Sequence, residues 1–121
     1  MKKVLIIEDD GFLQGLEAGK LEKVGYQVIT ASSGQQAMKQ IHEPEIGIIL
    51  LDLMLPDFDG FELLQNIRKM ETLKNVPVIV FSNLSEEKDV KRSKELGATD
   101  FLVKSNFTLE ELVEHIKNIE K

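Results

Sequence analysis

The chain has 121 residues, of which 42% are hydrophobic and 30% are charged, and its formal net charge is −6. This composition indicates one globular domain, the acidic balance argues against direct nucleic-acid binding, and the lack of cysteine excludes disulfides and thiolate metal sites. No apolar stretch approaches the ~20 residues that span a bilayer and no leader sequence precedes the first apolar run, so we expect a soluble, cytoplasmic chain without membrane partners.

In chain order, strand-like apolar runs alternate with segments of helical periodicity. The predicted elements of the first half are strand 3–8, helix 12–24, strand 27–31, a helix between Ser33 and Pro44, and strand 46–51. The helix over 12–24 is expected to end at Gly25 and to bury one face, formed by Leu13, Leu16, Leu21 and Val24. Ser33 and Gln36 have the spacing of a capping box for the next helix.

The second half continues the alternation. Its predicted elements are helix 60–70, strand 77–81, helix 85–96, strand 101–103 and a helix that begins at Thr108, where Glu111 completes a second capping box. Strands and helices that alternate in this way predict an α/β domain with a parallel sheet covered by helices on both faces. Because crossovers between parallel strands are right-handed, we expect a doubly wound fold.

Polar side chains follow the predicted strands where they end, and in a doubly wound sheet this edge carries the ligand site. Glu8 and Asp9 follow the first strand, Asp52 the third, Ser82 the fourth and Lys104 the fifth. Carboxylates that lie close together repel one another unless a cation joins them, so the acids predict a divalent metal site. Acids, a hydroxyl and an amine are also the groups needed to handle a phosphoryl group.

The chain resembles the receiver domains of bacterial two-component response regulators, including the stand-alone chemotaxis regulators. The matching segments are Ile7–Asp10, Leu50–Gly60, Val80–Ser82 and Gly97–Lys104. Together they cover essentially the whole chain, so we expect residues 1–121 to form one receiver domain. The resemblance implies a flavodoxin-like sheet of five strands in the order 2-1-3-4-5, with five helices.

Matching to the family, residue by residue, implies a role for each acid. Asp52 would be the phosphoacceptor, and Mg²⁺ would be held by Glu8, Asp9, Asp52 and the backbone carbonyl of Met54. Lys104 would pair with the phosphoryl oxygens, or with Asp52 when phosphate is absent.

The family also implies a switch. Ser82 would move to hydrogen-bond the phosphoryl group, and Phe101 would turn inward when Ser82 moves. A histidine kinase or phosphotransfer protein would supply the phosphoryl group. The face formed by the fourth helix, the fifth strand and the fifth helix would then change its binding to a protein target.

Such a domain catalyses only its own phosphorylation and dephosphorylation and is not an enzyme for a separate substrate. The alternative is an Mg²⁺-dependent aspartyl phosphatase, but such enzymes usually carry a second acid two residues after the nucleophile, where this chain has Met54. A pseudo-receiver that has lost its chemistry is a third interpretation. The intact set of acids, Ser82 and Lys104 argues against it, while Asn83 and Ser105 favour it.

Asn83 and Ser105 are departures from the family pattern. Ser105 stands where the family usually has proline after the lysine, which leaves open whether the Lys104–Ser105 bond is trans or cis. Asn83 replaces the usual alanine or glycine and is expected to slow phosphorylation by small donors. Met54 and Leu84, at the two positions that tune phosphoryl lifetime in the family, are apolar and predict a long-lived phosphoryl state.

Overall fold

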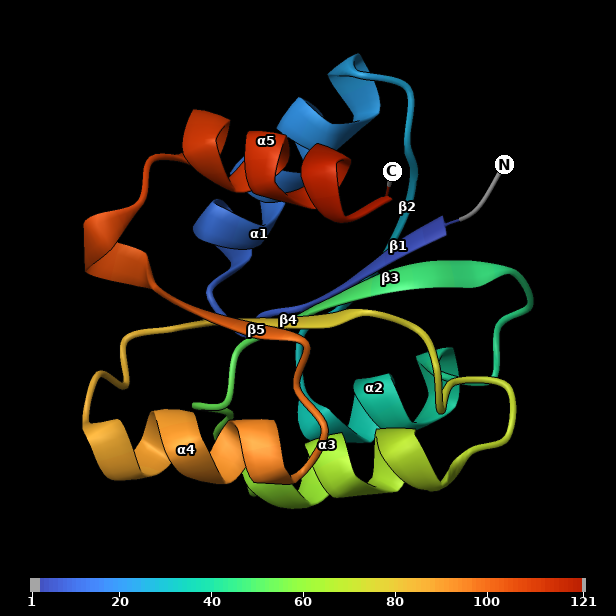
Figure 1. Cartoon of the computed structure of the whole chain (residues 1–121). Helices are drawn as coiled ribbons and strands as arrows, with labels where there is room; N and C mark the ends of the chain where they lie inside the picture. Colours follow the sequence, from blue (N-terminus) through green and yellow to red (C-terminus); the bar gives the residue numbers. More distant parts are fainter. Residues whose placement is uncertain (1–2, 121) are drawn as a thin grey trace.

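The computed structural model describes residues 3–120 (Figure 1). The elements are β1 (Lys3–Ile7), α1 (Gly11–Lys23), β2 (Gln27–Ala31), α2 (Gly34–Gln40), β3 (Ile46–Leu51), α3 (Gly60–Lys69), β4 (Val78–Ser82), α4 (Glu87–Glu95), β5 (Asp100–Val103), a 3₁₀ turn (Lys104–Asn106) and α5 (Leu109–Glu120). The expected alternation is therefore confirmed, and the predicted strands agree with the observed ones to within one residue. Within the described residues, none of the helices has the length and apolarity needed to cross a membrane.

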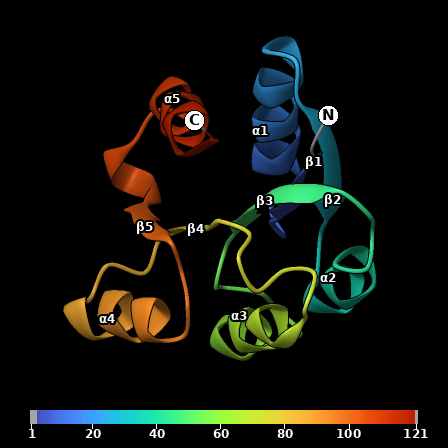
Figure 2. The same cartoon turned by 45° about the vertical axis from the view of Figure 1, so that its right-hand side comes forward.

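The five strands form one parallel sheet in the order β2-β1-β3-β4-β5, which confirms the doubly wound fold. Helices α1 and α5 cover one face of the sheet, and α2, α3 and α4 cover the other (Figures 1 and 2). The strand order reverses between β1 and β3, because the chain moves outward to β2 in one direction and to β4 and β5 in the other. This reversal point is where such sheets bind ligands.

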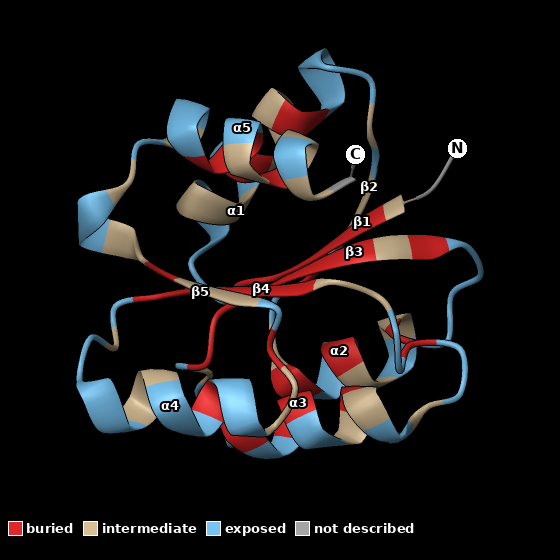
Figure 3. Ribbon diagram, viewed as in Figure 1, coloured by how far each residue is buried: buried red, intermediate tan, exposed pale blue. Residues whose placement is uncertain are grey.

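Two apolar cores lie on opposite faces of the sheet, and successive residues of β1 alternate between them. Val4 and Ile6 pack with α1 and α5, whereas Leu5 and Ile7 pack with α2 and α3. Figure 3 shows β1 and β4 as largely buried ribbons between helices with exposed outer surfaces. Burial on both faces explains why these strands have continuous apolar sequences instead of alternating ones.

The caps of the helices follow local sequence signals. The Asp10 side chain accepts hydrogen bonds from the first turn of α1, and the Thr108–Glu111 capping box is formed in both directions. Ser33 caps α2, but Gln36 reaches back to the N–H of Ser32 and not to that of Ser33. Gly25, with a φ of 99°, ends the turn after α1, as predicted.

The predicted inner face of α1 is wrong in part. Leu21 is buried, but Leu16 and Val24 are 41% and 47% exposed, and Glu17 is only 2% exposed. Glu17 and Leu21 lie one turn apart on the same stripe of the helix, so the stripe that faces the sheet includes an acid. Leu16 lies to one side of that stripe, and Val24 is the C-cap, beyond the last residue of the helix.

Strand register brings the predicted site residues to one edge of the sheet. Ile7 of β1 pairs with Leu51 of β3, and the N–H of Asp52 donates to the carbonyl of Ile7 at 2.9 Å. On the other side, Ser82 of β4 pairs with Val103 of β5. The residues that follow β1, β3 and β5 therefore lie close to Ser82, at the reversal point.

Candidate functional site

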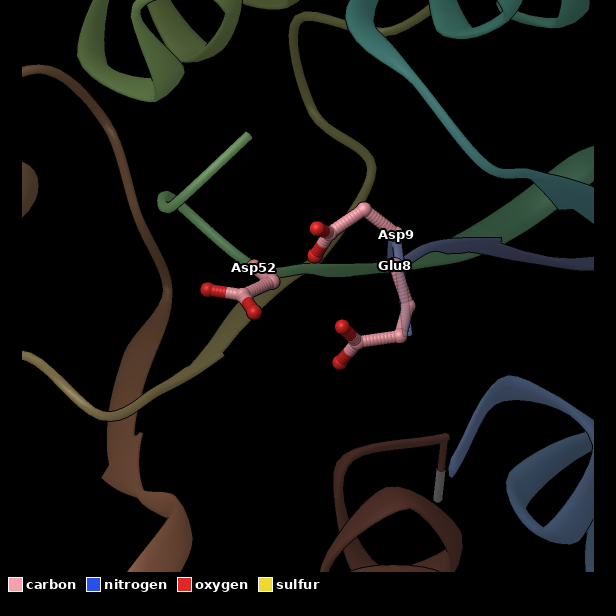
Figure 4. A group of neighbouring side chains, drawn as sticks. All are labelled: Glu8, Asp9 and Asp52. Carbon is pink, nitrogen blue, oxygen red and sulfur yellow. The ribbon is translucent and has the colours of Figure 1, made fainter. Parts of the chain in front are cut away.

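Three carboxylates gather beyond the ends of β1 and β3. Figure 4 shows Glu8, Asp9 and Asp52 directed into the same space, and one oxygen from each lies within 4.8 Å of the others. We call these three residues the acid cluster. Glu8 and Asp52 are buried, whereas Asp9 is exposed. Hard oxygen donors at this spacing fit Mg²⁺ or Ca²⁺, and the exposed Asp9 leaves the cluster open on one side.

Lys104 bridges two members of the acid cluster. Its Nζ lies 2.6 Å from an oxygen of Glu8 and 2.7 Å from Oδ2 of Asp52, and the side chain is only 13% exposed. The Lys104–Ser105 peptide bond is trans, and these residues form the 3₁₀ turn after β5. The missing proline therefore leaves the reach of the lysine to Asp52 intact.

Burial and ion pairing shift the pKa values of Glu8 and Lys104 in opposite directions. Burial raises the pKa of Glu8, with the charge of Asp52 adding to the effect, and the bond from Lys104 only partly offsets it. Burial acts to lower the pKa of Lys104, but its bonds to Asp52 and Glu8 outweigh this and hold the pKa above its usual value. Lys104 is therefore firmly cationic, and it supplies the positive charge that the acid cluster needs when no metal is bound.

The other oxygen of Asp52 accepts hydrogen bonds from the following loop and from β4. Oδ1 accepts from the Met54 N–H at 3.0 Å and from the Ser82 hydroxyl at 2.9 Å. Ser82 is fully buried. With Lys104 on Oδ2, Asp52 is fixed in orientation by three donors from three different segments.

The remaining residues named from the sequence lie around this centre. Phe101 of β5 is half-buried and packs against the core on the α2–α3 face. Asn83 is exposed, as is the side chain of Met54, while Leu84 is half-buried. The structure therefore brings together Glu8, Asp9, Asp52, Ser82 and Lys104.

Glu17 is a polar residue of this region that the sequence analysis missed. Its carboxylate is buried, and neither oxygen has a hydrogen-bond partner among residues 3–120. Burial, followed by the negative charge of Glu8, raises the pKa of Glu17 to about 8. Glu17 lies one helical turn before Leu21, and this spacing could have predicted that its side chain faces the core.

Gln14 was missed as well. Its side-chain amide donates to the carbonyls of Glu8 and Ala31 at 2.9 and 3.1 Å. These bonds tie α1 to the ends of β1 and β2, and thus hold the backbone of one member of the acid cluster. Only the folded structure brings these carbonyls together, so no local pattern predicted the contact.

Comparisons with known proteins show the family of the chain. A family model described as the response regulator receiver domain matches residues 4–117. The chain is 35% identical over 118 residues to a probable transcriptional regulator, ycf27, of Guillardia theta, and 31% identical over 118 residues to the phosphate regulon transcriptional regulatory protein PhoB of Escherichia coli. Each match covers 98% of this chain but only 45% and 51% of the respective relative, so the chain spans about half their length.

Comparison with solved structures also finds the fold of this family. The structure of the chemotaxis protein CheY4 of Vibrio cholerae superposes with a TM-score of 0.90, at 27% identity, over 98% of both chains.

Proposed function

Because the chain belongs to the response regulator receiver family, we propose that it is a phosphoacceptor switch and that Asp52 is the residue that carries the phosphoryl group. The observation that supports this most is the hydrogen-bonding of Asp52, which is buried and held by Lys104 and Ser82 beside two further acids. We also propose that residues 1–121 form a single receiver domain, one member of a two-component signalling pathway.

In this proposal the donor is a phosphohistidine of a histidine kinase or phosphotransfer protein. An Asp52 oxygen attacks phosphorus, a P–O bond forms, the P–N bond breaks, and the histidine keeps the electron pair of the broken bond. Lys104 is already cationic and adjacent to Asp52, so it can move onto the incoming phosphoryl oxygens without a change of protonation.

The acid cluster fits Mg²⁺ because its donors are carboxylate oxygens close together. Glu8, Asp9, Asp52 and the Met54 carbonyl would hold the ion. When bound, Mg²⁺ would supply charge neutralisation for the phosphoryl oxygens. Lys104 would then be free to leave Glu8, because the ion would replace its positive charge.

The switch follows from the charge added at Asp52. Ser82 donates to Asp52 in this structure, and a phosphoryl group there offers it a new acceptor within a short movement. Such a movement would pull the loop after β4 and allow Phe101 to turn inward. The face formed by α4, β5 and α5 would change as a result, and we propose that a protein target reads this face.

An aspartyl phosphatase remains the alternative of another class. The position two residues after Asp52 argues against it, because Met54 cannot protonate a leaving group. Unlike such an enzyme, a receiver domain would catalyse only its own phosphorylation and dephosphorylation, and it would signal by binding another protein.

Phosphorylation is tested by mass. We expect the protein, incubated with Mg²⁺ and acetyl phosphate, to gain the mass of one phosphoryl group, and Asp52→Asn to gain none. Beryllofluoride should shift the amide signals of Ser82, Phe101 and the α4–β5–α5 face in the wild type only. A wild type that neither gains mass nor responds to beryllofluoride would contradict the proposal.

The lifetime of the phosphoryl group gives a second prediction. Met54 and Leu84 offer no polar group that could orient an attacking water, so we expect a half-life of minutes or longer after the donor is removed. Met54→Asn should shorten it, and because the Met54 side chain is 51% exposed the variant should fold normally. Decay within seconds in the wild type would contradict the prediction.

A further inference from the structure

The loop of residues 53–59, between β3 and α3, is tied to the start of α2. Both oxygens of the Asp57 carboxylate accept backbone hydrogen bonds, Oδ1 from the N–H of Gly34 at 2.8 Å and Oδ2 from the N–H of Gln35 at 3.1 Å. These two bonds lower the pKa of Asp57, so the carboxylate is ionised at neutral pH and the bonds are charge-assisted. No sequence motif signals this contact, because the two partners lie 22 and 23 positions apart.

Packing fixes the same contact independently. A Cβ atom added at Gly34 would lie 2.2 Å from the Cβ of Phe58, so the loop rests directly on the backbone of α2. The first turn of α2 has its own cap as well, since the Ser33 hydroxyl accepts from the N–H of Gln36. The helix is therefore capped on one side by Ser33 and bound to the loop on the other by Asp57.

The loop of residues 53–59 is short and its two ends are paired, so a movement of Asp57 within the loop affects the ends as well. Met54 and Asp59 form an isolated antiparallel bridge across it. At the base, the N–H of Met54 donates to Oδ1 of Asp52, and at the other end the Asp59 side chain caps α3. A displacement of Asp57 would therefore be carried to Met54, beside the acid cluster.

We propose that Asp57 is a positioning residue that fixes the Met54 segment of the metal site by binding the loop of residues 53–59 to the first turn of α2. This inference rests on the proposed function, because it concerns the site that Glu8, Asp9, Asp52 and the Met54 carbonyl would form. In this inference Asp57 would contact neither the metal nor the phosphoryl group and would act through the loop.

The test compares two variants that remove a cap from the same helix. Asp57→Ala should weaken Mg²⁺ binding, measured by calorimetry, by about tenfold, the lower end of what loss of an outer-shell partner costs. Ser33→Ala removes a hydrogen bond from the same turn but leaves the loop bound, so its Mg²⁺ affinity should stay within about twofold of the wild type while its stability falls. Asp57→Asn, which retains one acceptor oxygen, should lie between the wild type and Asp57→Ala.

A second readout needs no metal. Hydrogen exchange of the Met54 amide, which is bonded to Asp52 in the wild type, should become faster in Asp57→Ala and in Gly34→Ala, but not in Ser33→Ala. Equal effects of Asp57→Ala and Ser33→Ala on both readouts, or no effect of Asp57→Ala on either, would overturn the inference. If the wild type binds no Mg²⁺, the proposed metal site fails, and the exchange of Met54 still decides the role of Asp57.

Discussion

Replacing Glu17 by glutamine should stabilise the protein by about 3 kcal/mol at about pH 7, and by about 5 kcal/mol above about pH 8. The cause is the carboxyl group buried without a hydrogen-bond partner among the described residues, whose pKa is raised from 4.5 to about 8. Well below pH 4.5 the group is protonated in both the folded and the unfolded state and contributes no pH dependence. As the pH rises toward 8, the unfolded state loses its proton first, so the stability of the wild type falls.

Urea unfolding of the wild type and of Glu17→Gln across this pH range measures the effect. The difference in free energy of unfolding should be small at low pH and should grow with a slope of about 1.4 kcal/mol per pH unit. Glu17→Leu removes the buried polar group altogether and should be more stable than Glu17→Gln at every pH. A difference between wild type and Glu17→Gln that does not change with pH would show that the charge of Glu17 is not the cause.

Replacing Lys104 by methionine should destabilise the metal-free protein by about 3 kcal/mol, because it leaves two buried carboxylates facing each other without a cation. Glu8 and Asp52 both lose their cationic partner, and their side chains are only 2% and 6% exposed. Magnesium should restore much of this lost stability, because the ion would replace the positive charge of the lysine. In the variant the ion also no longer competes with the lysine for the acid cluster. The variant should therefore bind Mg²⁺ more tightly than the wild type does.

Unfolding in urea with and without Mg²⁺, for the wild type and the variant, measures both effects. Lys20→Met is the matched control, because it removes an ion pair with Glu110 that lies on the surface. We expect this control to change stability little and to leave the response to Mg²⁺ unaltered. Equal Mg²⁺ stabilisation of the wild type and Lys104→Met would contradict the idea that lysine and metal share the acid cluster.

The strands could be predicted closely because their signal is local. A strand buried on both faces needs an unbroken apolar run, and strand 46–51 has one between Glu45 and Asp52, so its limits are those of the hydrophobic sequence. The acids of the site were predictable once the ends of the strands were known. In a parallel sheet, the residue after each strand lies at the same edge whatever the details of packing.

Helix faces and loop contacts were harder to predict because they depend on distant parts of the chain. The inner face of α1 was assigned from apolar residues alone, which left out Glu17, although its position relative to Leu21 is that of a buried residue. The contact of Asp57 with α2 joins segments separated by β3 and depends on the exact approach of Phe58 to Gly34. Residue type and spacing carry no information about such an approach.

Arg68, near the end of α3, limits how α4 can move. Its guanidinium donates to the carbonyls of Leu73 and Val76, at 2.8 and 2.6 Å, and to that of Gly97, at 2.8 Å, just beyond the last turn of α4. The opposite end of α4 begins at Glu87 with no side-chain cap, next to the loop that follows Ser82. The C-terminal end of α4 is thus held by Arg68, while its N-terminal end has no side-chain cap. In the proposed switch, a movement of Ser82 would therefore tilt α4 about Gly97, and the proposed target would bind a helix whose tilt has changed more than its position.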